Sequence, residues 1–243
     1  MQFKSIHRSF IEKPLLSEIE KALVATSCLS SGIDNYPLKD YMLQSLFINL
    51  TGSQEQKLRC ICWDIASVDF YFRYHWLKGE YALREYSDLE AKSKIYLKLV
   101  KSIEEFSREP MDLSDTLDKQ AISSDSKQEI VVLFDNSVYR FWKESEYLAF
   151  KKDGKSFKTC HFATNTLLSP PLGDIYNALY EERNRCAHNT ISFQENNPLL
   201  INLSASSNLN RNYFEWLALL NLIDKVFVGL YGEFVSLIEN KLY

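Results

Sequence analysis

Apolar residues recur at intervals of three and four along most of the chain. The clearest run is the last one, where nine such positions from Trp216 to Ile238 form a continuous apolar seam. This spacing places the apolar side chains on one face of an α-helix. Seven glycines and six prolines also supply few of the tight turns that a β-protein needs. The sequence therefore predicts an all-α fold, an antiparallel helical bundle that forms a single domain over residues 1–243.

Turn-forming and capping residues divide this pattern into separate helices. We expect Gly52 to end one helix and Ser53 to cap the next. Asp69 and Arg73, four residues apart on that next helix, are expected to form an ion pair. The serine-rich stretch 108–128 is expected to be an exposed loop. The expected helices cover residues 15–30, 42–50, 55–77, 87–106, 128–150, 173–188 and 216–238.

A strand pattern competes with a helix between Tyr147 and Cys160. Asp153 and Gly154 favour a tight turn, which would give one small β-hairpin near 147–160. A helix that ends at Gly154 would have a similar sequence. The residues leave both alternatives open.

Composition and charge restrict the class of partner. The chain has 28 Lys and Arg residues against 32 Asp and Glu residues, for a formal net charge of -4, so a uniformly basic surface is excluded, although a local basic cleft is not. Its five cysteines lack the paired spacing of a zinc site. The chain has no apolar run of the roughly 18 residues that a membrane helix requires, and no apolar signal segment at its start. We expect a soluble, cytoplasmic protein with no membrane association, metal site or cofactor.

One short segment, residues 183–188, carries side chains that suit phosphodiester chemistry. On a continuous helix, Asn184 and His188 are four residues apart and share a face, and Arg183 lies about 100° away around the axis. Histidine exchanges a proton near neutral pH, and arginine binds phosphate through two parallel hydrogen bonds. Asparagine can orient either of them.

This segment resembles the R-x(4-6)-H motif of the HEPN superfamily, in the form with a polar residue directly after the arginine. Members are small α-helical bundles, and many are metal-independent ribonucleases of toxin–antitoxin, abortive-infection and other antiviral systems. The resemblance implies a HEPN-like domain whose substrate is RNA and which works as a homodimer, with both motifs facing one cleft. An antitoxin or another defence-system protein is a further candidate partner. Members that pair with nucleotidyltransferase antitoxins carry a tyrosine where this chain has Thr190.

The resemblance also assigns roles to residues. His188 would act as general base or acid, Arg183 would stabilise charge on the phosphorane, and Asn184 would position one of them. Arg185 would contribute to RNA binding. Attack of a ribose 2′-hydroxyl on its own 3′-phosphate would then leave a 2′,3′-cyclic phosphate and a 5′-hydroxyl.

Other interpretations rest on the same residues. The apolar seams suit a non-catalytic binding or adaptor module as well as an enzyme. His188 could contact the carbonyl groups at the helix end, with Glu181 and Arg185 forming an ordinary ion pair. The aromatic run Phe70–Trp76 could stack nucleic-acid bases, but its helical spacing is more typical of core and interface positions.

Overall fold

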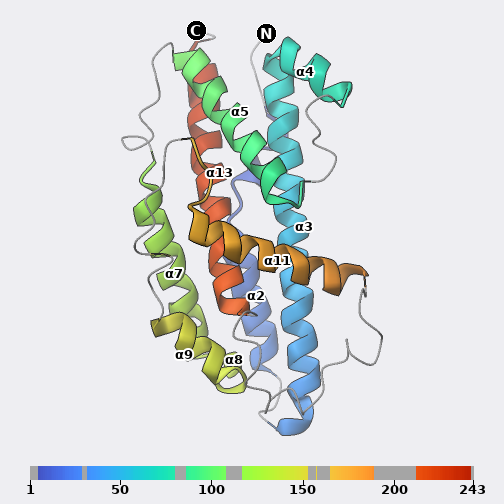
Figure 1. Cartoon of the computed structure of the whole chain (residues 1–243), viewed down its shortest axis with the longest axis vertical. Helices are drawn as coiled ribbons and strands as arrows, with labels where there is room; N and C mark the ends of the chain where they lie inside the picture. The colour runs from blue at the N-terminus through green and yellow to red at the C-terminus, as the bar shows by residue number, and fades with distance from the viewer. Residues whose placement is uncertain are drawn as a thin grey trace.

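The computed structural model describes residues 5–28, 32–79, 86–107, 117–152, 157, 165–188 and 212–241. Every regular element within these ranges is a helix, which confirms the all-α prediction (Figure 1). The elements are α1 (Arg8–Ile11), α2 (Leu16–Ser27), a short 3-10 helix η1 (Ile33–Asn35), α3 (Tyr36–Val68), α4 (Phe70–Leu77), α5 (Leu89–Ser107), α7 (Lys119–Asp135), α8 (Val138–Trp142), α9 (Glu144–Lys152), α11 (Pro170–His188) and α13 (Tyr213–Lys241).

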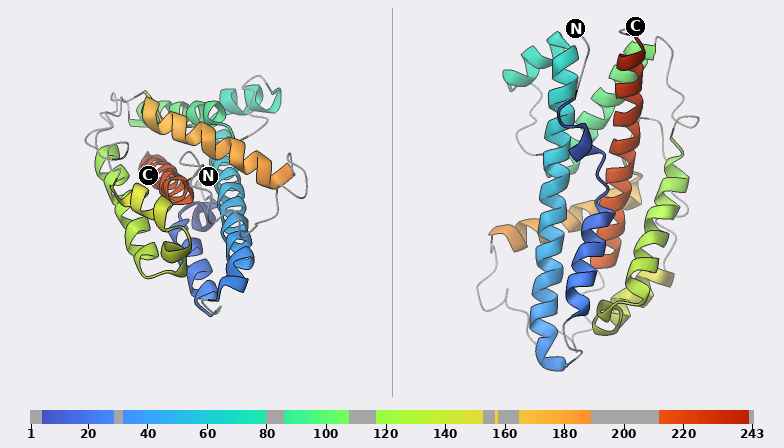
Figure 2. Two further views of the ribbon diagram at one scale, coloured as in Figure 1. Left: turned by 60° about the horizontal axis from the view of Figure 1, so that its bottom comes forward. Right: turned by 180° about the vertical axis from the view of Figure 1, so that it is seen from behind.

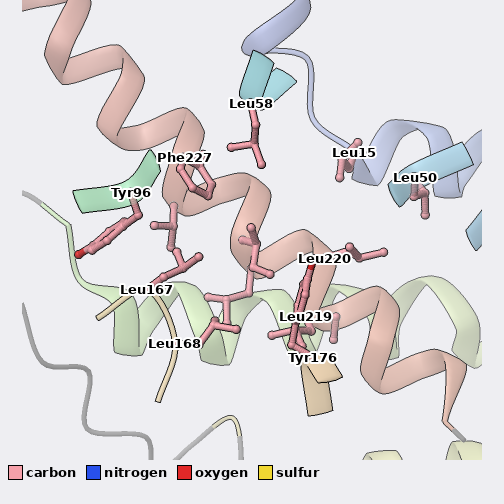
Figure 3. Packing of buried hydrophobic residues seen from close by; sticks show 14 of the residues in the cluster. Leu15, Leu50, Leu58, Tyr96, Leu167, Leu168, Tyr176, Leu219, Leu220 and Phe227 are labelled. Atoms are coloured by element: carbon pink, nitrogen blue, oxygen red, sulfur yellow. The ribbon is translucent and has the colours of Figure 1, made fainter. Parts of the chain in front are cut away.

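Helix α13 forms the centre of the bundle, and α2, α3, α5, α7 and α11 surround it (Figure 2). Because neighbours cover it on several sides, α13 is apolar around most of its circumference. Residues from α3, α5 and α11, including Leu58, Tyr96 and Tyr176, pack with Leu220 and Phe227 of α13 in one core (Figure 3). Despite its apolar character α13 is not a candidate membrane span, and neither is any other helix in the described ranges.

Residues 36–68 form one continuous helix, so the prediction that a helix ends at Gly52 was wrong. Leu50 and Leu58, on either side of the glycine, are both buried against the same core. A glycine inside a helix costs about 1 kcal/mol relative to alanine, which is small beside the burial of a continuous apolar face. Tertiary packing therefore carries α3 through Gly52.

The helix ends instead at Asp69, whose backbone is extended (φ −110°, ψ 100°). Its side chain accepts a hydrogen bond from the backbone N–H of Phe72 at 2.9 Å and so caps α4. The same carboxylate accepts from Lys98 Nζ of α5 at 2.6 Å. The predicted ion pair with Arg73 is therefore wrong, because Asp69 serves as a helix cap and binds α5.

The predicted loop over 108–128 is helical in its second half, since α7 starts at Lys119. Asp118 caps this helix by accepting from Ala121 N. Two serines that suggested solvent exposure are buried: Ser126, and Ser123, whose hydroxyl donates to the carbonyl oxygen of Phe157. Residues 108–116 lie outside the described residues. Packing of α7 on α13 thus overrides a polar local composition.

The first strand of the hairpin considered near 147–160 does not form, because Tyr147 and Phe150 belong to α9. Both side chains are fully buried and lie three residues apart, on the inner face of the helix. Acidic residues in the first turn of α9 and lysines in the last turn also favour the helix through its dipole. Residues 153–156 and 158–160 lie outside the described part of the chain.

Candidate functional site

Helix α11 carries the predicted motif and crosses the long helices α3 and α13 (Figure 1). It starts at Pro170, a few residues before the predicted start, and its inner face is held by the buried side chains of Leu172, Tyr176 and Leu179. The helix is continuous to its last residue, His188. Asn184 and His188 therefore share a face, as predicted for a continuous helix.

Arg183 is held in a fixed orientation between its own helix and α3. Its Nη2 donates to Glu55 Oε1 at 3.0 Å, and its Nη1 donates to Asn184 Oδ1 at 3.0 Å. The ion pair with Glu55 is half-buried, with 22% of the arginine side chain and 13% of the glutamate side chain exposed. Glu55 was not singled out from the sequence, because a partner 128 residues away leaves no local signal.

His188 lies at the exposed C-terminal end of α11. The exposed position leaves the imidazole accessible to a bound substrate. Within the described residues, no hydrogen bond joins His188 to Arg183 or Asn184. The chain thus pairs the arginine with the asparagine and leaves the imidazole open to solvent.

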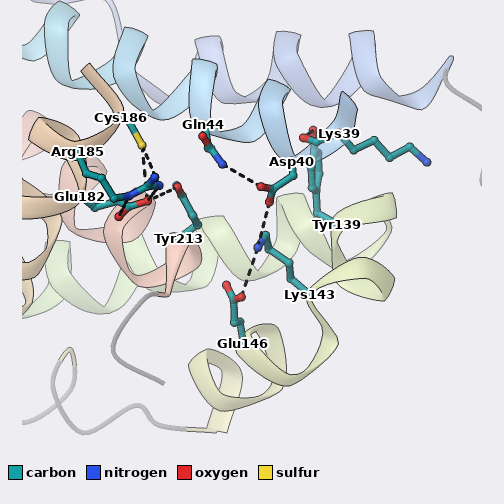
Figure 4. A network of polar contacts seen from close by, with 10 residues as sticks. All are labelled: Lys39, Asp40, Gln44, Tyr139, Lys143, Glu146, Glu182, Arg185, Cys186 and Tyr213. Carbon is teal, nitrogen blue, oxygen red and sulfur yellow. Dashed lines mark hydrogen bonds and ion pairs between the residues drawn. The ribbon is translucent and has the colours of Figure 1, made fainter. Parts of the chain in front are cut away.

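Arg185 is bound inside the chain by Glu182, which is 4% exposed (Figure 4). Its Nε donates to Glu182 Oε2 at 2.7 Å, and this contact holds the pKa of the guanidinium above its ordinary value. Tyr213 of α13 donates to the same carboxylate at 2.8 Å. The expected pair with Glu181 is therefore wrong. Burial, reinforced by Glu182, raises the pKa of Cys186 to about 11 and keeps that thiol neutral.

Behind the Arg183–Glu55 ion pair lies a buried lysine, Lys92 of α5. Its Nζ donates to Gln54 Oε1 at 2.9 Å, and only 1% of the residue is exposed. Burial lowers the pKa of Lys92 to about 7, against the opposing attraction of Glu55. Periodicity placed this part of α5 in the core but gave no indication of a lysine there.

Within the described residues, no three His, Cys, Asp or Glu side chains are grouped so as to hold a metal ion. The pair Cys160 and His161 lies outside those residues. The site therefore offers an oriented guanidinium, a carboxamide and an exposed imidazole, which together can bind a phosphate and exchange a proton. Comparisons of the chain with models of protein families, with curated proteins and with solved structures found no match.

Proposed function

We propose that this protein is a metal-independent endoribonuclease of the HEPN type, which acts as a homodimer in antiviral defence or toxin–antitoxin growth control. One observation carries the proposal. Arg183, Asn184 and His188 follow the HEPN pattern on a single continuous helix whose last turn is accessible. A histidine sealed inside the subunit would have argued against this function.

The contacts of Arg183 suit a phosphate-binding role. Glu55 and Asn184 fix the guanidinium of Arg183 in place. Each of them accepts a hydrogen bond from only one N–H group of the guanidinium. A guanidinium has five such donors, so others stay available to stabilise the charge on a phosphorane. Asn184 thus acts as the positioning residue for Arg183.

The reaction is an internal transesterification of RNA. The ribose 2′-oxygen attacks the adjacent phosphorus as its proton passes to a base, and the bond from phosphorus to the 5′-oxygen breaks as that oxygen receives a proton. In a homodimer, the His188 side chains of the two copies would supply the base and the acid. The products are a 2′,3′-cyclic phosphate and a 5′-hydroxyl.

Cleavage of a labelled single-stranded RNA in EDTA tests this proposal. Arg183→Ala and His188→Ala should each slow cleavage by about 100-fold or more, since general acid–base and electrostatic contributions have this size. Asn184→Ala should also slow it. Asn177→Ala is the matched control, because Asn177 is exposed on the same helix away from the motif.

Circular dichroism and sedimentation should show unchanged helicity and oligomeric state in these variants. Cleavage at the wild-type rate in both Arg183→Ala and His188→Ala would overturn the assignment. A wild-type protein that leaves RNA intact would favour the alternative of a non-catalytic adaptor.

A further inference from the structure

Helix α4 exposes most of its aromatic side chains. Phe70 and Tyr71 are 71% and 67% exposed, and Phe72 alone in this run is fully buried. Of the core and interface positions expected from the helical spacing, Phe72 is a core position, and Trp76 packs partly buried against the same core. We call the exposed group the α4 surface; it consists of Trp63, Phe70, Tyr71, Tyr74 and Leu77. Contiguous exposed apolar groups of this kind mark an interaction site.

Exposed cations are interleaved with these rings. Arg59, Arg73 and Lys78 are all exposed, and none of them pairs with a carboxylate within the described residues. Each lies against an aromatic ring instead. The distances to the ring centroids are 5.2 Å for Arg59 Cζ over Tyr86, 5.2 Å for Arg73 Cζ over Phe70 and 4.2 Å for Lys78 Nζ over Tyr74.

The two acidic residues between Arg59 and Lys78 do not offset this positive charge at the surface. Asp64 is buried and accepts a hydrogen bond from Tyr231 Oη at 2.6 Å, and Asp69 is bound by Lys98. Over the described residues 59–79, the exposed charge of the α4 surface is thus positive, in a chain whose net charge is -4. Self-association through this surface about a twofold axis would bring like charges together, so an anionic partner fits better.

An open pocket of about 580 Å³ adjoins the α4 surface. The rings of Trp63 and Trp76 meet edge to face in it, with centroids 6.2 Å apart. Trp76 Nε1 donates to Tyr86 Oη at 3.2 Å, which fixes a second wall. Flat aromatic walls beside a guanidinium suit a nucleobase. The pocket is lined by Ile6, His7, Arg59, Cys60, Trp63, Trp76 and Tyr86.

The pocket also lies between the α4 surface and the motif on α11. Arg59 follows Glu55, the partner of Arg183, by one turn of α3. Helix α4 starts fifteen residues after Glu55, about 22 Å further along at 1.5 Å per residue. An RNA strand bound at the motif could therefore run along α3 to α4, which lies at the far end of α3 (Figure 1).

We propose that the α4 surface and its pocket bind single-stranded RNA by stacking bases on exposed rings, with Arg59, Arg73 and Lys78 holding the phosphates. The inference rests on the proposed function in one respect: the strand is the RNA that the α11 motif cleaves. Stacking on protein aromatics tolerates different bases, so the site selects unpaired strands rather than a particular sequence.

Binding of a labelled 2′-O-methyl single-stranded RNA, measured by fluorescence anisotropy, tests this inference without cleavage. Such RNA lacks the 2′-hydroxyl nucleophile. Trp63→Ala and Tyr71→Ala should each weaken binding about five-fold or more, and duplex RNA should bind less well. Both side chains are exposed, so neither change empties the core. Phe141→Ala is the matched control, because Phe141 is 73% exposed on α8 and lies beside Arg140.

Unchanged affinity in both Trp63→Ala and Tyr71→Ala would overturn the inference, as would a wild type that does not bind the RNA. Loss of self-association with unchanged RNA affinity would also overturn it and would identify the α4 surface as a protein interface. The two proposals fail separately. If wild type binds through Trp63 and Tyr71 but does not cleave unmodified RNA, only the nuclease fails; if His188→Ala loses cleavage but the ring variants bind normally, only the α4 surface fails.

Discussion

The buried lysine behind the motif gives a stability prediction with a definite sign. Lys92 is 1% exposed, and burial lowers its pKa from 10.5 to about 7. Between these two values the unfolded chain binds more protons than the native chain, so stability rises with pH across the interval. Below about pH 7 the lysine is protonated in both the native and the unfolded state, and the contribution of Lys92 to the stability of the fold stays at its least favourable value.

Replacing Lys92 by methionine removes the titration while keeping a long side chain of similar volume. At about 1.36 kcal/mol per pH unit, the two units between pH 7 and 9 correspond to about 2–3 kcal/mol. The free energy of unfolding of wild type, relative to Lys92→Met, should therefore rise by about 2–3 kcal/mol between pH 6.5 and 9. The loss of the hydrogen bond to Gln54 adds an offset that is the same at both pH values.

Guanidinium chloride unfolding at several pH values, followed by circular dichroism, measures this difference. Lys94→Met is the control, because Lys94 lies two residues away on the exposed side of α5, where its side chain is 42% exposed. The difference in the free energy of unfolding between Lys94→Met and wild type should vary little with pH. A difference for Lys92→Met that is equally flat from pH 6.5 to 9 would refute the reasoning, because the lysine would then stay charged in the native state.

Three further substitutions test local features of the fold and of the site. Gly52→Ala should raise the free energy of unfolding by about 0.5–1 kcal/mol, because a Cβ there meets no atom within 4 Å; a loss of stability in urea unfolding would contradict the continuous helix. Asp69→Ala should lower it by about 1–2 kcal/mol through loss of the α4 cap and of the contact with Lys98, and an unchanged urea midpoint would show that neither matters. Glu55→Gln should slow RNA cleavage about ten-fold with unchanged helicity, since a neutral amide holds Arg183 less firmly, and a wild-type rate would remove Glu55 from any positioning role.

The sequence predicted best those helices whose buried face is continuous and long. The seam from Trp216 to Ile238 lies within α13, where the core requires an apolar residue at almost every turn. The same principle explains the error at Gly52. Local turn chemistry suggested an end to the helix, but the apolar stripe on both sides of the glycine packs on one core and carries the helix through. Tertiary packing, and not local turn chemistry, therefore decides that the helix continues through Gly52.

The candidate site was predictable only in its local part. The spacing of Asn184 and His188 fixed their common face once the helix proved continuous. Glu55 and Lys92 come from other helices, and no periodicity brings them to Arg183. For the aromatic residues of α4, the local pattern predicted the helix but not which rings are exposed. Their helical spacing is the same whether they face the core or solvent, so only the packing of α4 on α3 revealed that most of them are exposed.

The chemistry of the RNA ends tests the central proposal most directly. A defined single-stranded RNA is incubated in EDTA with wild type or with His188→Ala, and the products are identified by mass spectrometry. The account predicts a 2′,3′-cyclic phosphate and a 5′-hydroxyl with wild type, and intact RNA with the variant. Products with 5′-phosphate ends, or equal cleavage by His188→Ala, would contradict it.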